Sequence, residues 1–303
     1  MDPAQQLVLT RLQQRLDELP LLPSVVLELM RLDSDADDYF DRVADLVAGD
    51  PTFAARLLRY SNSAYISAPY AVTSIRDALS LVGSKGAVEL VLAHSAMRIF
   101  LPRHDWERNL WNHSIAVGCL MRNLATVVAR ELPVRPEEAQ TFGLLHDIGR
   151  FVLYLEAPES LRAIDETDWE TPAALVEAEI SICGFTHAEL GYLALQKWKL
   201  PPELALAVRH HHFRAGELSG ISPHFRPLVR LLREADIIAV RVARTNADWL
   251  AIPEADLRAF VDKPSEDSVL VPSDALVKAI RLGLVNAVRM RDALGLTSPG
   301  VAH

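Results

Sequence analysis

Seven side chains of types that hold metal ions recur along this 303-residue sequence, each in a stretch that is otherwise apolar. Five are histidines and two are aspartates: His113, His146, Asp147, His187, His211, His212 and Asp236. Imidazole and carboxylate are ligands that zinc, iron and manganese use in proteins. A buried group of either kind is costly unless it is paired or bound to a cation. The set therefore predicts a site for a divalent transition metal, Fe, Mn or Zn.

The centre of the set is FGLLHDIGR, residues 142–150. Neighbouring positions of a helix point about 100° apart. His146 and Asp147 would then flank one ion, or Asp147 would bridge two ions with its two oxygens. Gly149, which has no side chain, would let another helix or a ligand approach closely.

Each of these side chains also has an ordinary structural interpretation. A lone histidine on an apolar helix is more often a hydrogen-bonded core residue than a metal ligand. His211 and His212 would form a solvated run with His210, and Asp236 would cap a helix or pair with Arg233. The recurrence of such groups on one helix after another weakens this interpretation, although an all-structural scaffold stays open.

The elements that must position these groups are helices, because most of the chain has helical periodicity. Asp50-Pro51 and Ser74 mark helix starts, since aspartate and serine cap helices well. A helix is predicted from Pro136 through HDIG, with FVLYLEAP continuing after the glycine. The stretch SVLVP, residues 268–272, is a candidate strand. The predicted fold class is all-α.

Three regions are predicted along the chain. Residues 15–104 form an N-terminal helical lobe, and residues 105–245 form the lobe with the metal site. Residues 246–303 form a C-terminal helical extension with a disordered end. Trp111 and Trp198 fall at helical spacing and are expected in the core.

Composition narrows the class of protein. The net charge is −9, so counterion release would not favour broad binding to nucleic acid. No apolar stretch reaches the roughly 20 residues of a membrane span, and the N-terminus does not resemble a signal peptide. The two cysteines, Cys119 and Cys183, are interpreted as buried free thiols in a reducing compartment, with one long-range disulfide as the alternative. The sequence thus predicts a cytoplasmic protein that binds neither membranes nor nucleic acid broadly.

In their order along the chain, His113, His146-Asp147 and Asp236 resemble the H…HD…D signature of the HD superfamily of metal-dependent phosphohydrolases. The wider resemblance, over roughly residues 15–240, is to its HDOD branch, the HD-related output domain. That resemblance includes GDPTFAARLLRYSNSAYIS, WNHSIAVGCL and THAELGYLALQKWKLPPELALAVRHHH. It implies an HD-domain-like multi-helix bundle.

The resemblance also assigns ligands. His113, His146, Asp147 and Asp236 match the ligands of a single-metal HD site. The remaining three side chains match the extra histidines of the two-metal HD-GYP enzymes, which hydrolyse cyclic di-GMP: His187, His211 and His212. The resemblance therefore implies one or two ions.

This sequence departs from the HD-GYP pattern at three places. Arg150 stands where those enzymes have lysine, and the GYP loop is missing after His212. Asn109 replaces a ligating glutamate one turn before the first histidine. These departures argue against cyclic di-GMP hydrolysis and leave metal binding open.

Two functions follow from the resemblance. The first is a bacterial-type regulatory protein of signal transduction that senses a ligand and contacts other signalling proteins. A nucleotide second messenger is one expected partner, and a homodimer through residues 273–294 is another expectation. The alternative is an active phosphohydrolase, a phosphodiesterase or nucleotidase acting on a nucleotide or cyclic dinucleotide. In it, Asp147 would hold the metal, Arg150 would steady a phosphate, and His187 or His212 would protonate the leaving oxygen.

Overall fold

The computed structural model describes residues 3–62, 72–129, 132, 134–167, 169, 171–213, 218, 221–223, 225–245, 247–262 and 268–296. These described residues form helices and loops, with no strand among them. The predicted all-α class is confirmed. The candidate strand at 268–272 is wrong: this stretch is a loop that leads into the last helix.

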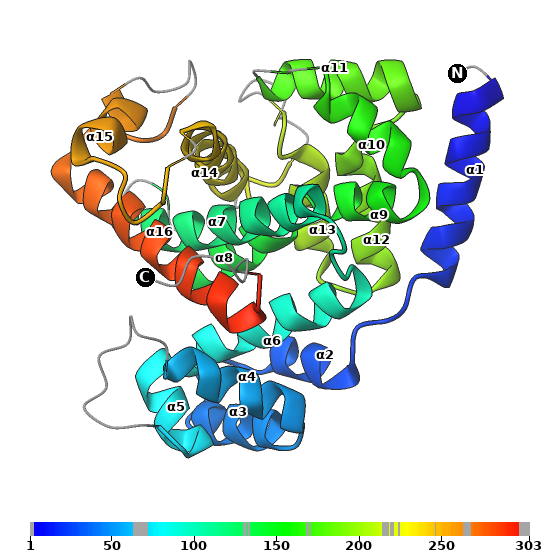
Figure 1. The fold of residues 1–303 in the computed structure, drawn as a ribbon. Coiled ribbons are helices and arrows are strands. Elements are labelled where there is room, and N and C mark those ends of the chain that lie inside the picture. The colour runs from blue at the N-terminus through cyan, green and yellow to red at the C-terminus, as the bar shows by residue number, and fades with distance from the viewer. Residues whose placement is uncertain are drawn as a thin grey trace.

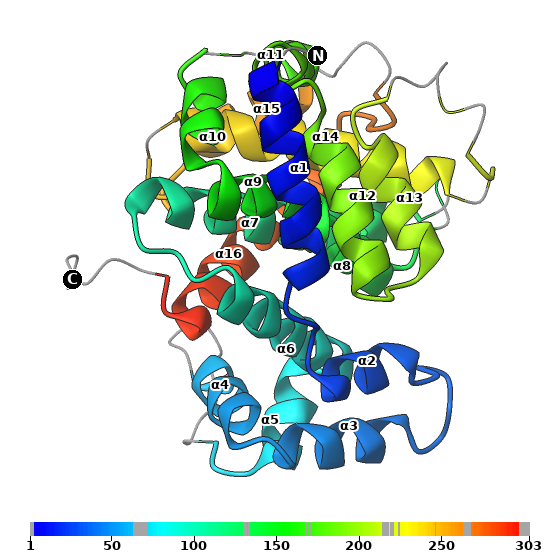
Figure 2. The same cartoon turned by 90° about the vertical axis from the view of Figure 1, so that its right-hand side faces the viewer.

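The helices lie in two tiers that both views separate clearly (Figures 1 and 2). The lower tier contains α2 (Ser24–Arg31), α3 (Tyr39–Ala48), α4 (Pro51–Ser61), α5 (Ile75–Val82) and α6 (Ser84–Ile99). The upper tier contains α7 (Asp105–Val127), α8 (Pro136–Leu145), α9 (Ile148–Glu156), α10 (Pro158–Asp165), α11 (Pro172–Cys183), α12 (His187–Lys197), α13 (Pro202–His210) and α14 (Arg226–Arg244). The side chains that resemble an HD site are all carried by the upper tier.

Three further helices flank the two tiers, namely α1 (Pro3–Glu18), α15 (Glu254–Asp262) and α16 (Asp274–Leu294). Helix α1 packs along α9, α11 and α12 (Figure 2). Helix α16 packs along α7 in the upper tier and also touches α4 in the lower tier (Figure 1). At its end, Arg56 of α4 donates a hydrogen bond to the Ala293 carbonyl at 2.7 Å. The division into three regions stays a prediction, as does the homodimer.

Local sequence explains where many helices begin. The Asp50 carboxylate accepts hydrogen bonds from the backbone N–H groups of Thr52 and Phe53, which α4 leaves without a partner inside the helix. Ser74 caps α5 in the same way. Thr186 and Glu189 form a reciprocal capping box at the start of α12. This box fixes the point at which His187 enters the helix.

One continuous apolar core joins the two tiers. Helix α6 is buried on nearly every side because it lies between the tiers and contacts α2, α3, α4, α5 and α8. Trp111 and Trp198 are fully buried, as expected. Cys119 and Cys183 are buried and unpaired, which agrees with the free-thiol interpretation. Among the described residues, none of the helices combines the length and apolar character needed to cross a membrane.

Candidate metal centre

The HD pair lies at a break between two helices. The sequence predicts one helix through HDIG, but α8 ends at Leu145 and α9 begins at Ile148. Asp147 has φ −96° and ψ 15°, outside the helical region, while His146 stays helical. The chain therefore turns at His146-Asp147, and the expected 100° geometry of a continuous helix does not apply.

Two glycine contacts bring the site-bearing helices together. At the crossing of α7 and α8, a side chain on Gly143 would lie 2.7 Å from the Gly118 Cα. A side chain on Gly149 would overlap the His187 carbonyl oxygen and lie 2.7 Å from the Gly191 backbone nitrogen. The close approach expected at Gly149 is therefore made by a helix, α12. These contacts set His113 beside the HD pair on one side and His187 on the other.

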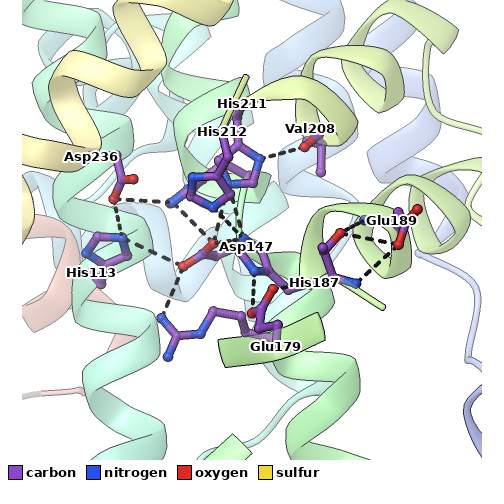
Figure 3. Close-up of polar contacts among 12 residues, drawn as sticks. His113, Asp147, Glu179, His187, Glu189, Val208, His211, His212 and Asp236 are labelled. Atoms are coloured by element: carbon purple, nitrogen blue, oxygen red, sulfur yellow. Dashed lines mark hydrogen bonds and ion pairs between the residues drawn. The ribbon is translucent and has the colours of Figure 1, made fainter. Parts of the chain in front are cut away.

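The seven predicted side chains converge, and all of them except His146 are labelled in Figure 3. His113, His146 and Asp236 form what we call the first ligand group, whose ligand atoms lie within 4.8 Å of one another. The His113 Nε2 is 3.1 Å from the Asp236 Oδ1, and the His146 Nε2 is 4.0 Å from the same oxygen. These residues come from α7, the α8–α9 break and α14.

The second ligand group consists of His187, His211 and His212, whose ligand atoms also lie within 4.8 Å of one another. The His187 Nε2 is 3.1 Å from the His211 Nε2 and 3.0 Å from the His212 Nε2. Helix α13 ends at His210, so His211 and His212 turn inward at its C-terminal end. The solvated-run alternative is therefore wrong for His211, which is fully buried.

Asp147 lies between the two groups. Its Oδ1 is 3.1 Å from the His187 Nε2 and 3.5 Å from the His146 Nε2. Its Oδ2 is 3.7 Å from the His113 Nε2. The Oδ1 oxygen thus lies near members of both groups, while the Oδ2 oxygen faces the first group, and a carboxylate in this position is suited to contact ions held by either group.

In His146 and His211, the hydrogen bond made by Nδ1, which points away from the cluster, shows that Nε2, which points into the cluster, carries a lone pair. The His146 Nδ1 donates to the Gly143 carbonyl at 2.7 Å, and the His211 Nδ1 donates to the Val208 carbonyl at 2.6 Å. A carbonyl only accepts, so each proton is on Nδ1 and each neutral ring directs a lone pair from Nε2 into the cluster. This is the support that metal-binding histidines receive in proteins.

The donor set fits a divalent transition metal. The buried His146 Nε2 has no hydrogen-bond partner in the described part of the chain. Lone pairs of neutral imidazoles and ionised carboxylates meet at this point, and a cation satisfies them together. The nitrogen and oxygen donors suit Fe, Mn or Zn, and neither Cys119 nor Cys183 belongs to these groups.

Charge is distributed unevenly over the cluster. Burial opposes the ionised form of Asp147, but His146, His187 and Arg150 hold its pKa well below the usual value. Burial alone would lower the pKa of His187, yet the Glu179 and Asp147 carboxylates outweigh it and raise that pKa to about 10. Burial, then His187 and His146, lower the pKa of His211 to about 3. The cluster therefore holds ionised carboxylates beside the neutral His146 and His211, with a proton on His187 that a cation would displace.

Glu179 is a functional candidate that sequence reasoning missed. Its carboxylate is fully buried, lies 2.5 Å from the His187 Nδ1 and accepts the His187 backbone N–H at 3.0 Å (Figure 3). It lies on α11, on a buried stripe with Leu175 and Cys183 at a spacing of four residues. A carboxylate on an apolar stripe is the signal that would have identified it. Asn109, at the position where the HD-GYP pattern has a ligating glutamate, is exposed on α7.

A cavity of about 420 Å³ opens beside the cluster. Its lining includes His113, Asp147, Arg150, His212 and Asp236, among them members of both ligand groups. The Arg150 Nη1 is 3.6 Å from the Asp147 Oδ2, and its Nη2 pairs with Asp165. The cavity is thus continuous with the candidate ligands and large enough for a small organic molecule.

The other described histidines do not join the cluster. His94 is buried in α6 in the lower tier. His104 is exposed, and His210 is half-buried with its Nδ1 donating to the Leu206 carbonyl. His224 and His303 lie outside the described residues.

The fold and the cluster define a class: all-helical proteins with an HD-type arrangement of histidines and aspartates. The sequence profile of the HDOD domain matches residues 19–213. The chain belongs to the HDOD family, which confirms the resemblance seen in its sequence.

Two solved structures share this fold. A protein of Shewanella amazonensis SB2B, provisionally named a phosphohydrolase, is 24% identical with a TM-score of 0.65, covering 92% of this chain and 98% of its own. A protein of Marinobacter aquaeolei VT8, provisionally named a signal transduction protein, is 20% identical with a TM-score of 0.64, covering 94% of this chain and 60% of its own. At these identities the likeness shows the fold alone.

A curated relative extends beyond the matched region. A protein of Treponema pallidum (strain Nichols), for which no function is named, is 27% identical over 248 residues. The match covers 81% of this chain and 47% of that protein. The chain thus spans about half the length of the curated relative it matches.

Proposed function

We propose that this chain is a regulatory signal-transduction protein whose metal centre binds a phosphate-bearing ligand. The observation that carries the proposal is the cavity lined by His113, Asp147, His212 and Asp236. A ligand in this cavity would meet both ligand groups at once. Divalent ions held there would coordinate phosphoryl oxygens as Lewis acids.

The residues around the ions would do the rest of the binding. Asp147 would contribute to both groups, since its carboxylate lies beside His187 of one group and beside His146 and His113 of the other. Arg150 is fixed by Asp165 and Asp147 and lines the cavity, so its remaining N–H groups would donate to a phosphate. A nucleotide second messenger has the phosphate chemistry that this site requires.

Packing contacts through α7 and α16 connect the metal centre with the lower tier. His113 lies on α7, which packs along α16, and α16 in turn touches α4 of the lower tier. Ligand contact with His113 would shift this packing, and the lower tier or α16 would present the change to another signalling protein. The two buried free thiols support a cytoplasmic location.

A second function, that of a metal-dependent phosphohydrolase, is favoured by the position of Asp147 between the two groups. Two ions bridged by a carboxylate can activate a water and stabilise the leaving oxygen. Asp147 would hold the ions and Arg150 would steady the phosphate. His212 lines the cavity whereas His187 is fully buried, so His212 is the one of the two that would contact a bound ligand.

One experiment separates the two functions. The metal-loaded protein and its Asp147→Ala variant would be incubated with mono-, di- and cyclic nucleotides and added Mn²⁺ or Fe²⁺, and both binding and release of product would be measured. Metal-dependent binding without turnover supports the sensor. Turnover that disappears in Asp147→Ala overturns the sensor in favour of the hydrolase, and a protein that neither binds nor hydrolyses any of them contradicts both.

A further inference from the structure

One face of α14 continues the cavity away from the metal centre. Asp236, Ile237, Val240, Arg241 and Arg244 all line it. Their spacing of one, four, five and eight residues from Asp236 keeps them on one side of a helix. The cavity therefore follows α14 from a candidate metal ligand towards the end of the helix.

This cavity is rich in cationic side chains although the protein is acidic. The chain has a net charge of −9, yet the cavity is lined by Arg150, Arg233, Arg241 and Arg244. Among the described lining residues, the carboxylates are Asp147 and Asp236, and both contact histidines of the metal centre. Arg241 and Arg244 lie farther along α14 than Asp236, where their guanidinium groups are suited to contact an anion.

The arginines at the far end are held by backbone carbonyl groups. The Arg244 Nη2 donates to the Trp169 carbonyl at 2.7 Å, and the Arg241 Nη1 donates to the Phe260 carbonyl at 2.9 Å. At Arg244 the carbonyl positions the guanidinium, which has five N–H donors in all. Such fixed arginines suit the recognition of a phosphate or carboxylate.

The wall between the two ends is apolar. Pro172 and Leu175 of α11 face the cavity, as do Ile237 and Val240 of α14. Eight residues separate Asp236 from Arg244, which corresponds to about 12 Å along the helix axis. A ligand that uses the whole cavity therefore has an anionic group at each end and an apolar or planar body between them.

We propose that the cavity selects an elongated phosphate ester with two anionic ends, one at the metal centre and one at Arg241 and Arg244. The first end rests on the function proposed above, while the second end adds a specificity determinant on α14. The two claims can fail separately. Binding of the first end depends on the metal ions, whereas binding of the second end depends on Arg241 and Arg244.

The test compares two bisphosphates of different length with a monophosphate, so that the distance between the two anionic ends is varied. Octanediol bisphosphate, octyl phosphate and ethanediol bisphosphate would be titrated calorimetrically into the metal-loaded protein. We expect octanediol bisphosphate to bind about tenfold more tightly than octyl phosphate, the size of one charge-assisted contact. Ethanediol bisphosphate should show no such gain, because it is too short to reach the second end.

Arg244→Ala is the variant that locates the second end. Arg244 is exposed, so its replacement should leave folding intact, which thermal melting would check. We expect the variant to bind both octyl ligands equally, with the affinity for octyl phosphate unchanged. Arg209→Ala is the matched control, because Arg209 lines a different cavity that also touches His212. It should keep the tenfold difference.

Three results would overturn this inference: equal affinities in the unmodified protein, a difference that survives Arg244→Ala, or a difference lost in Arg209→Ala instead. A protein that binds none of the three probes while holding stoichiometric metal would also overturn it. Loss of metal alone, with the length dependence retained, would count against the proposed function and not against the second end.

Discussion

His94 in the lower tier and His146 and His211 of the metal centre are all buried, but their surroundings differ. Both ring nitrogens of His94 lack a hydrogen-bond partner in the described part of the chain, and its ring meets Phe53 edge-on at 5.9 Å. His146 and His211 each donate one nitrogen to a carbonyl and direct the other into a cluster. Burial and spacing alone do not distinguish the two kinds of histidine. The two kinds are distinguished by the carbonyl group that accepts from one ring nitrogen and by the convergence of the other ring nitrogens on a common point.

The largest expected effect comes from breaking the helix contact that creates the convergence. Gly149→Ala would place a methyl group on the His187 carbonyl oxygen, which is backbone and cannot move aside easily. We expect the free energy of unfolding to fall by at least about 3 kcal/mol, as measured by denaturant unfolding.

Gly86→Ala is the control for this change. Gly86 also lies in a helix, but its new methyl group would meet the Val82 side chain at 3.2 Å. A change within about 1 kcal/mol is expected there, because alanine favours the helix and a side chain can adjust. Equal effects of the two substitutions would show that the α9–α12 contact is not a special constraint.

A smaller effect is expected from removing the partner of one cluster histidine. Glu179→Gln keeps the shape of the side chain but loses the charge that faces the His187 Nδ1. We expect the affinity for Mn²⁺ or Zn²⁺ to fall by about 10- to 100-fold, the usual cost of losing such a partner. Competition with a chelator of known affinity would measure it.

Glu177→Gln is the matched control for Glu179→Gln. Glu177 lies on the same helix but is exposed. Its substitution should leave metal affinity unchanged. If the two variants bind metal equally well, the support that Glu179 gives to His187 has no part in binding.

The smallest effect concerns His94 itself. Burial, with Arg56 and Arg98 nearby, lowers its pKa to about 4, below the usual value of about 6.5. The unfolded chain therefore takes up a proton on His94 below pH 6.5, whereas the folded chain does so only near pH 4. The stability contributed by neutral His94 is complete above pH 6.5 and is lost as the pH falls towards 4.

His94→Leu removes this proton uptake. We expect the free energy of unfolding of the variant to depend less steeply on pH between 6.5 and 4 than that of the unmodified protein, as measured by urea unfolding at a series of pH values. Parallel curves for the two proteins would mean that His94 is already paired or accessible in the folded state.

Much of the fold was accessible from the sequence because it depends on local signals. Asp50 and Ser74 begin helices where capping chemistry predicts them. The break at His146-Asp147 was missed because neither of these residues is a proline or glycine, and the packing of Gly149 on α12 is a contact between distant segments. The strand expected at 268–272 was wrong because β-branched residues also occur in loops that pack on a core.

The types of the seven side chains were accessible, whereas their partners were not. Residue type and order suggested the cluster, but Glu179 reaches His187 from another helix, and only the fold reveals that contact. The arginine face of α14 was likewise hidden, because Arg241 and Arg244 look like ordinary surface residues in sequence. Their proposed role becomes apparent only from the cavity that they line together with residues of α9 and α11.

The central claim is that the two ligand groups hold metal ions and that His94 does not. The most direct test is elemental analysis of protein purified without a histidine tag, after loading with Fe²⁺, Mn²⁺ or Zn²⁺ and removal of excess metal. The account predicts one or two ions per chain, a lower content in His146→Ala, and an unchanged content in His94→Leu. A protein without stoichiometric metal, or a content equally reduced in both variants, would contradict it.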